Sequence, residues 1–166
     1  MESQHILSVL ADNNSGVLLR ISGLFSRRGY NIASLSAAET ENPKVSRMTI
    51  VVNSDEDTLE QICKQLNKLV DIKEVRVLAP DNAVCREHIL IQAGTSPETR
   101  SGLIEVANLF RANILDTAAN SLILELTGSP RKIQAFVQLV EPYGIRRLVK
   151  TGVSALERGE IGPFEE

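Results

Sequence analysis

Residues 5–32 read HILSVLADNNSGVLLRISGLFSRRGYNI, and this stretch introduces the pattern that the rest of the chain follows. Apolar residues alternate over positions 5–11, which predicts a half-buried strand. From Val17 to Phe25 they recur every three or four residues, as on one face of a helix, and Gly29 is a typical helix stop. The stretch therefore predicts a strand, a turn, a helix and the beginning of a second strand.

The alternation of strands and helices continues as far as residue 78. We predict strands over 30–40, 47–52 and 72–78, a loop over 41–44 and a helix over 57–70. The apolar stripe of this second helix consists of Leu59, Ile62, Cys63, Leu66, Leu69 and Val70. The resulting order, βαββαβ, is that of a ferredoxin-like domain.

The same order returns after residues 79–82, where proline and asparagine interrupt both periodicities. One helix is predicted to begin at residues 95–98, in one of two registers. Either Ser96 is its cap with Pro97 in the first helical position, or Thr95 and Glu98 form a capping box. Ser129 and the proline that follows it predict the start of another helix in the same way. The strands of this half are expected at 87–93, 113–118, 122–127 and 145–150.

The fold class is therefore α+β, with two ferredoxin-like βαββαβ domains in one chain. We place the first domain at residues 1–79, a linker at 80–84, the second domain at 85–158 and a frayed tail at 159–166. Val51 and Ile123 point away from the side of each sheet that the helices would cover. Because apolar faces without cover are typical of interaction surfaces, we expect a partner there.

Composition restricts the function classes. Apolar residues make up 43% of the chain and charged residues 23%, and the net charge is −3. An acidic chain without clustered Lys and Arg is a poor match for nucleic acid, because that binding depends on phosphate neutralisation. No apolar run approaches the roughly 20 residues that span a bilayer, and the start lacks the features of a secretory signal. We therefore expect neither nucleic acid nor membrane as a partner, and a cytoplasmic location, with an already trimmed plastid form as the alternative.

Catalysis has little support in the sequence. The two histidines, His5 and His88, lie near the starts of predicted strands, where surface histidines are ordinary. Cys63 falls in an apolar helical stripe and Cys85 in the linker region, and neither belongs to a zinc or redox motif. No nucleophile elbow, phosphate loop or zinc-protease motif occurs. We therefore predict no catalytic residues, no metal site and no cofactor in this chain.

The most informative segment joins the first strand to the first helix and contains Asn13, Ser15, Gly16, Val17 and Leu18. The first N–H groups of a helix lack intrahelical partners, and together with the helix dipole they suit a carboxylate. Gly16 has no Cβ, so a ligand can approach the backbone closely. The same residues also fit an ordinary capped helix start, and spacing alone does not separate the two interpretations.

A second polar position follows the helix, where Gly29 leads directly into the next strand. Asn31 is a poor strand former, which suggests a role in hydrogen bonding. The helix is about 18 Å long at 1.5 Å per residue, so Asn13 and Asn31 lie at its opposite ends. Two copies related by a two-fold axis could bring Asn13 of one next to Asn31 of the other.

These residues resemble a known family. The pattern Asn13-x-Ser15-Gly16-x-Leu18, followed by LFSRRGYNI at 24–32, is similar to the N-terminal ACT domain of acetohydroxyacid synthase (acetolactate synthase) small regulatory subunits. SRMTI at 46–50 and KQLNKLV at 64–70 continue the resemblance. LFRANILD at 109–116, ELTG at 125–128 and TGV at 151–153 resemble the C-terminal domain of the same family.

The resemblance implies a non-catalytic subunit that forms a homodimer and binds a large catalytic subunit containing thiamine diphosphate, magnesium and FAD. Such subunits activate the enzyme and confer feedback inhibition by valine or a related branched-chain amino acid. The resemblance places the effector between two ACT domains. The site would consist of Asn13, Ser15, Gly16, Val17 and Leu18 from one chain with Asn31 and Ile32 from the other.

Three alternatives share the βαββαβ order. An RNA-recognition module needs stacking aromatics on its central strands, where this chain has Met48, Ile50 and Val52. An acylphosphatase-like enzyme would show hydrolase activity. A stand-alone amino-acid sensor that regulates another enzyme is the nearest alternative, and co-purification with a large synthase subunit would distinguish it.

Overall fold

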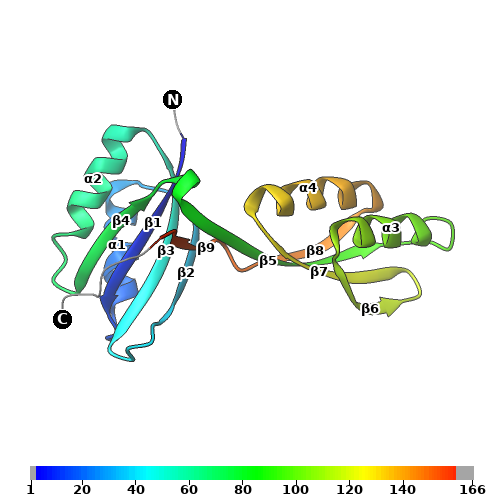
Figure 1. The fold of residues 1–166 in the computed structure, drawn as a ribbon, viewed down its shortest axis with the longest axis horizontal. Coiled ribbons are helices and arrows are strands. Elements are labelled where there is room, and N and C mark those ends of the chain that lie inside the picture. Colours follow the sequence, from blue (N-terminus) through cyan, green and yellow to red (C-terminus); the bar gives the residue numbers. More distant parts are fainter. Residues whose placement is uncertain (1–2, 160–166) are drawn as a thin grey trace. The chain divides into compact units, whose positions relative to one another are not determined.

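The computed structural model describes residues 3–159 and contains two compact units. The first unit holds the described residues up to Val84 together with those from Val153 onward, and the second holds Cys85–Gly152. Each unit has βαββαβ order (Figure 1), so the predicted pair of ferredoxin-like domains is confirmed.

The first unit is a four-stranded antiparallel sheet with two helices on one face (Figure 1). The spatial order of the strands is β2-β3-β1-β4, so the first and third strands lie at the centre. The elements are β1 (Ser3–Asp12), α1 (Val17–Arg28), β2 (Ile32–Glu39), β3 (Val45–Ser54), α2 (Glu56–Leu66) and β4 (Ile72–Leu78).

The core of this unit lies between the sheet and its helices. Alternate residues of β1 and β3, such as Leu7 and Ile50, are fully buried against Ile21 of α1 and Ile62 of α2. Every second residue of these strands and one face of each helix therefore pack together in a single buried layer. This packing fixes where α1 begins and ends relative to the sheet, which positions the candidate site.

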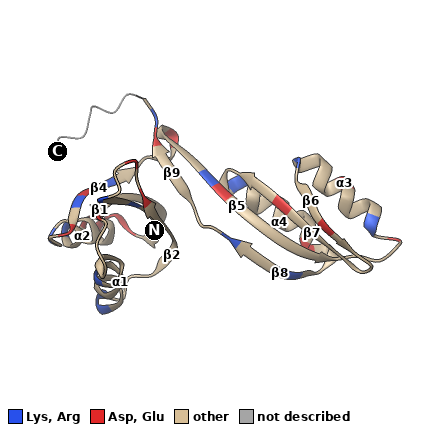
Figure 2. Cartoon of the chain, turned by 90° about the horizontal axis from the view of Figure 1, so that it is seen from below, with Lys and Arg blue, Asp and Glu red and all other residues tan. Residues whose placement is uncertain are grey.

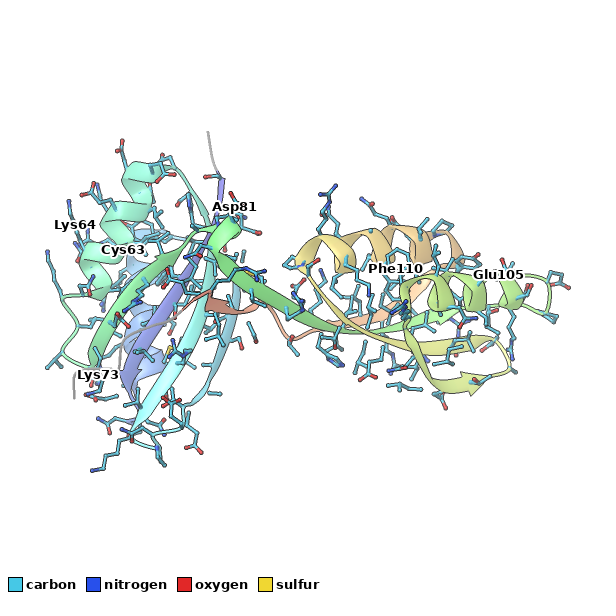
Figure 3. All side chains as sticks on the ribbon, viewed as in Figure 1. Cys63, Lys64, Lys73, Asp81, Glu105 and Phe110 are labelled. Atoms are coloured by element: carbon cyan, nitrogen blue, oxygen red, sulfur yellow. The ribbon has the colours of Figure 1, made fainter. Side chains whose placement is uncertain are left out.

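The second unit repeats the arrangement, with strand order β6-β7-β5-β8 and with α3 and α4 on one face (Figure 1). Its core contains Phe136 of α4, whose ring centroid lies 5.3 Å from that of Phe110 at the end of α3 (Figure 3). The elements are β5 (Ala83–Gly94), α3 (Arg100–Phe110), β6 (Asn113–Ala118), β7 (Ser121–Gly128), α4 (Pro130–Val140) and β8 (Ile145–Lys150). Two 3-10 turns, Pro80–Asn82 and Glu141–Tyr143, precede β5 and β8.

The second helix is shorter than predicted. It ends at Leu66 because Asn67 caps it, with the Asn67 side-chain amide donating to the Cys63 carbonyl at 2.9 Å. The chain then turns, and Val70 is 92% exposed instead of belonging to the buried stripe. Leu69, three residues past the helix, still packs against the core.

The start of the third helix also differs from the prediction, whereas that of the fourth agrees with it. Ser96 and Thr99 exchange hydrogen bonds in a turn that precedes α3, and the helix itself begins at Arg100. The proline at position 97 therefore lies in this turn and not in the first helical position. In α4 the Ser129 hydroxyl accepts from the Lys132 N–H at 3.3 Å, as expected for a helix cap.

The chain returns to the first unit after the second, which the sequence analysis did not predict. Residues 153–158, assigned above to the second domain, belong to the first unit, where β9 (Ser154–Glu157) lies against β1. β9 also pairs with β5, a strand that starts at Ala83 in the first unit and continues into the second. Val51, expected to be uncovered, is only 1% exposed. The expectation of an open outer face was therefore wrong for the first unit, while Ile123 in the second is half-buried. Most of the predicted tail, residues 160–166, lies outside the described residues.

Within residues 3–159, none of the helices is long and apolar enough to cross a membrane.

Candidate functional site

The junction of β1 and α1 has an unusual helix start. Gly16 occupies the N-cap position with φ of 88° and ψ of −8°, a left-handed conformation that favours glycine. No side chain caps the helix, so this is not the ordinary capped helix start that the same residues would also fit. The first regular helical bond runs from the Arg20 N–H to the Gly16 carbonyl at 2.9 Å. The Val17 N–H makes a long hydrogen bond of 3.5 Å to the Asn14 carbonyl, so the N–H groups of Gly16 and Leu18 are the ones left for a ligand.

Asn13 ties this junction to the loop between β2 and β3. Its side-chain amide donates to the Pro43 carbonyl at 2.9 Å, and its oxygen accepts from the Ser46 hydroxyl at 2.8 Å. Its backbone N–H donates to the Lys44 carbonyl. Three hydrogen bonds thus fix the orientation of Asn13. Because the residue is exposed, the second N–H and the second oxygen lone pair of its side-chain amide can still reach a ligand.

An ion pair holds the first turn of α1 to the start of β4. Arg20 Nε lies 2.7 Å from Asp71 Oδ2 and Nη2 lies 2.9 Å from Oδ1, so the guanidinium binds the carboxylate through two nitrogens. A Cβ built on Gly16 would lie 3.7 Å from the remaining nitrogen, Nη1. The helix entrance, by which we mean the backbone of residues 16–18, therefore has a fixed guanidinium beside it.

The two apolar residues that open α1 have different surroundings. Val17 is buried in the core, so only its backbone can meet a ligand. Leu18, predicted to contact the effector, has a side chain that is 45% exposed. An apolar group bound at the helix entrance could therefore contact Leu18 but not Val17.

The other end of α1 carries the second predicted group of residues. Gly29 caps the helix in a left-handed conformation with φ of 69°, as its position in the sequence predicted. Asn31 is exposed, and its side chain has no hydrogen-bond partner within the described residues. Ile32 is half-buried and packs against the core at the start of β2.

The seven predicted site residues therefore form two groups on one chain. Asn13 to Leu18 lie at the N-terminal end of α1 and Asn31 and Ile32 lie beyond its C-terminal end. Twelve helical residues separate the groups by about 18 Å at 1.5 Å per residue. A single copy does not assemble them into one site.

The two histidines and Cys63 have structural surroundings. His5 Nε2 lies 3.1 Å from the Ser54 carbonyl, and His88 Nε2 lies 2.9 Å from Glu125 Oε1. Cys63 lies on α2 (Figure 3), and burial raises the pKa of its thiol, which disfavours the reactive thiolate. Each of these groups is accounted for by packing or hydrogen bonding within its own unit.

Charged residues of both signs are intermingled over the elements of each unit (Figure 2). In the part of the chain that the structure describes, no three His, Cys, Asp or Glu side chains come close enough to hold a metal ion.

Arg20, Asp71 and Ser46 are neighbours of the site that sequence reasoning did not identify. Arg20 follows Gly16 by four residues, so helical spacing could have placed it on the same side of α1. Asp71 and Ser46 are 51 and 33 positions away from their partners. Only the pairing of β1 with β3 and β4 brings them to the helix entrance.

Comparison with known families assigns both halves of the chain. A family model described as "AHAS small subunit-like ACT domain" matches residues 7–74, and one described as "Small subunit of acetolactate synthase" matches residues 86–159. These two matches cover the two βαββαβ motifs and agree with the resemblance inferred from the sequence motifs.

Individual relatives agree with this assignment. The chain is 48% identical over 158 residues to the acetolactate synthase small subunit of Mycolicibacterium smegmatis, covering 95% of this chain and 93% of that protein. It is 45% identical to a probable acetolactate synthase small subunit of Archaeoglobus fulgidus, covering 94% and 98%. The crystal structure of the acetolactate synthase small subunit from Thermotoga maritima matches with a TM-score of 0.86 at 35% identity, covering 96% and 99%. This chain therefore belongs to the family of acetolactate synthase small subunits, the regulatory and not the catalytic chains of that enzyme.

Proposed function

We propose that this chain confers feedback inhibition on acetolactate synthase by binding valine, or a related branched-chain amino acid, at the entrance of α1. The observation that carries the proposal is the left-handed Gly16 at the start of a helix that no side chain caps. The effector carboxylate accepts from the N–H groups of Gly16, Val17 and Leu18, and the dipole of α1 favours its negative charge.

The rest of the effector is bound by both copies of a homodimer. Its ammonium group meets the amide oxygens of Asn13 and of Asn31 from the other copy, or carbonyl oxygens near them. Its aliphatic side chain packs against Leu18 and, across the two-fold axis, against Ile32. The exposed Asn31 amide and the half-exposed Leu18 side chain support this arrangement, because both are available on the surface of one copy.

Selectivity among branched-chain amino acids should be modest. One methylene in an apolar pocket is worth about 1–3 kcal/mol, and the apolar part of this site has few side chains. Leucine and isoleucine therefore bind more weakly than valine but are not excluded.

The chain acts on a large catalytic subunit, which holds the thiamine diphosphate, magnesium and FAD on which the reaction depends. Association with this chain raises the activity of the catalytic subunit, and effector binding lowers it again. Inhibition requires that the effector favours one arrangement of the dimer, and such couplings typically amount to about 1–3 kcal/mol. We expect the complex to function in the cytoplasm.

Calorimetry of the purified chain with valine, leucine and isoleucine, together with a synthase assay in which the catalytic subunit is titrated with this chain, tests the proposal. We expect heat of binding for valine, a rise in synthase activity on addition of the chain, and loss of that rise when valine is present. Absence of binding to all three amino acids would reject the effector site.

A stand-alone amino-acid sensor that regulates a different enzyme is the second candidate. It has the same entrance geometry at α1 but requires no catalytic synthase subunit. Co-purification of a tagged chain from cells that contain the catalytic subunit separates the two functions. Recovery of the catalytic subunit in constant proportion supports the synthase assignment, and its absence supports the sensor.

A further inference from the structure

We infer that residues 153–158, here called the C-terminal strap, close the outer face of the first unit's sheet, so that the second unit is an insertion within the first. The outer face is the side of the sheet opposite α1 and α2. The strap is the occupant of a surface that the sequence suggested would receive a partner.

The residues on the outer face are buried although no helix covers them. Leu10 of β1, Val51 of β3 and Leu78 of β4 are at most 5% exposed and do not belong to the cluster that packs under the helices. The pairing registers place Val51 and Leu10 out of phase with the residues that face the helices. A second, separate apolar layer therefore exists on this side of the sheet.

The strap alternates as a strand with one face buried. Val153 and Ala155 are each 5% exposed, whereas Ser154 and Leu156 between and after them are exposed. β9 lies against β1, whose outward residues belong to the outer face. Val153 and Ala155 therefore turn toward the first unit, as expected for a strand that closes an apolar face.

Polar contacts anchor the end of the strap. Arg76, which lies on the outer face opposite Ser8, is 3.3 Å from Glu157 through Nη1 and Oε2. The Asn82 side-chain amide donates to Glu157 Oε1 at 3.3 Å, and the Arg158 N–H donates to the Asn82 carbonyl at 2.8 Å. All of these partners belong to the first unit.

The chain consequently crosses between the units twice, at 84–85 and at 152–153. Substitutions that disrupt the packing of the strap should destabilise the first unit, although the strap follows the second unit in the sequence. If such substitutions destabilised only the second unit, the inference would be contradicted, because the strap would then be a C-terminal extension that stabilises the second unit.

Two matched pairs of variants in the full chain test the inference. Ala155→Asp places a carboxylate in the buried layer and Ser154→Asp places one on the exposed side of the same strand. Val153→Ala and Leu156→Ala form a milder pair that removes methyl groups without adding charge. Hydrogen exchange measured by mass spectrometry follows peptides from β1 and β3 separately from peptides within 100–150.

We expect Ala155→Asp, and to a smaller extent Val153→Ala, to speed exchange of β1 and β3 amides, by roughly tenfold or more for the charged variant. Peptides within 100–150 should exchange as in the wild type, and Ser154→Asp and Leu156→Ala should change neither set. Equal behaviour within each pair would overturn the inference, as would faster exchange confined to residues 100–150. If Ala155→Asp does not fold, the Val153 and Leu156 pair decides alone.

Discussion

Arg20 and Asp71, 51 residues apart in the chain, form a two-pronged ion pair that fastens the first turn of α1 to the start of β4. The pair is asymmetric, since the Asp71 side chain is 11% exposed and the Arg20 side chain is 49% exposed. It lies next to Gly16, so it contributes both to the stability of the first unit and to the position of the helix entrance.

The asymmetry predicts that Arg20→Ala destabilises the chain more than Asp71→Ala. Removing the arginine leaves a buried carboxylate without its charged partner, which costs about 1–3 kcal/mol. Removing the aspartate leaves a guanidinium that can turn toward water, so that the loss should be smaller. Urea denaturation of both variants measures the difference, with Arg27→Ala, at an exposed helical position, as the control. Equal losses for both partners would contradict this explanation.

Substitution of Gly16 should separate charge from backbone strain at the proposed site. Gly16→Asp places a carboxylate where the effector's carboxylate is proposed to bind, and it should abolish feedback inhibition while the catalytic subunit is still activated. Gly16→Asn has a side chain of the same size without the charge, and asparagine tolerates positive φ better than most residues. The strain in either variant should cost about 1 kcal/mol.

The measurement for Gly16 is valine inhibition of the reconstituted synthase, with thermal unfolding of each variant as the control for folding. We expect Gly16→Asn to retain part of the inhibition because it adds bulk but no negative charge. A Gly16→Asp variant that is still fully inhibited by valine would show that the effector binds elsewhere.

The helix caps of the second unit should contribute unequally to stability. Ser129→Ala removes an oxygen that accepts from the Lys132 N–H at the start of α4, and it should cost roughly 1 kcal/mol. Ser96→Ala removes two contacts to Thr99 in an exposed turn ahead of α3, at 3.4 Å from its N–H and 3.2 Å from its hydroxyl, and it should cost under about 0.5 kcal/mol. Thermal melts of the two variants provide the comparison. A larger loss of stability for Ser96→Ala than for Ser129→Ala would contradict this prediction.

The contribution of Glu125 to stability should depend on pH. Hydrogen bonds from His88, and then from Asn113, lower the pKa of Glu125 in the folded state. A carboxyl group whose pKa is lower in the folded than in the unfolded state binds more protons when the chain is unfolded. Its contribution to the free energy of unfolding is therefore fully present above the unfolded-state pKa and is lost as the pH falls through the folded-state pKa. The stability difference between the wild type and Glu125→Gln should therefore shrink between neutral pH and about pH 3. A difference that grows on acidification would contradict the assignment.

Helix starts show how far local sequence information reaches. Ser129 and Pro130 were recognised because a cap and a proline act within one turn of the helix they begin, and the structure confirms both. Near residue 96 the same signals occur, but Ser96 and Thr99 satisfy each other in a separate turn and α3 starts later. Local rules identify the chemistry of a helix start, while competing local hydrogen bonds shift its position.

The candidate site shows the other limit. Gly16, Gly29 and the exposed amide of Asn31 were identifiable because turn conformation and helix termination are properties of a few adjacent residues. The neighbours of Gly16 were not, because Asp71 approaches Arg20 only after β4 pairs with β1. Ser46 likewise reaches Asn13 only through the pairing of β1 with β3.

The amino-acid sequence by itself determined the two βαββαβ motifs and the glycine that ends α1, because periodicity and glycine placement act over a few residues. Only the tertiary structure decided which surfaces stay open. The strap from residues 153–158 closes the outer face of the first unit, and this depends on the pairing of β9 with β5, about 70 residues away, and on its packing against β1, about 150 residues away. Such pairing results from the burial of apolar area and from hydrogen bonds that no local pattern in the chain encodes.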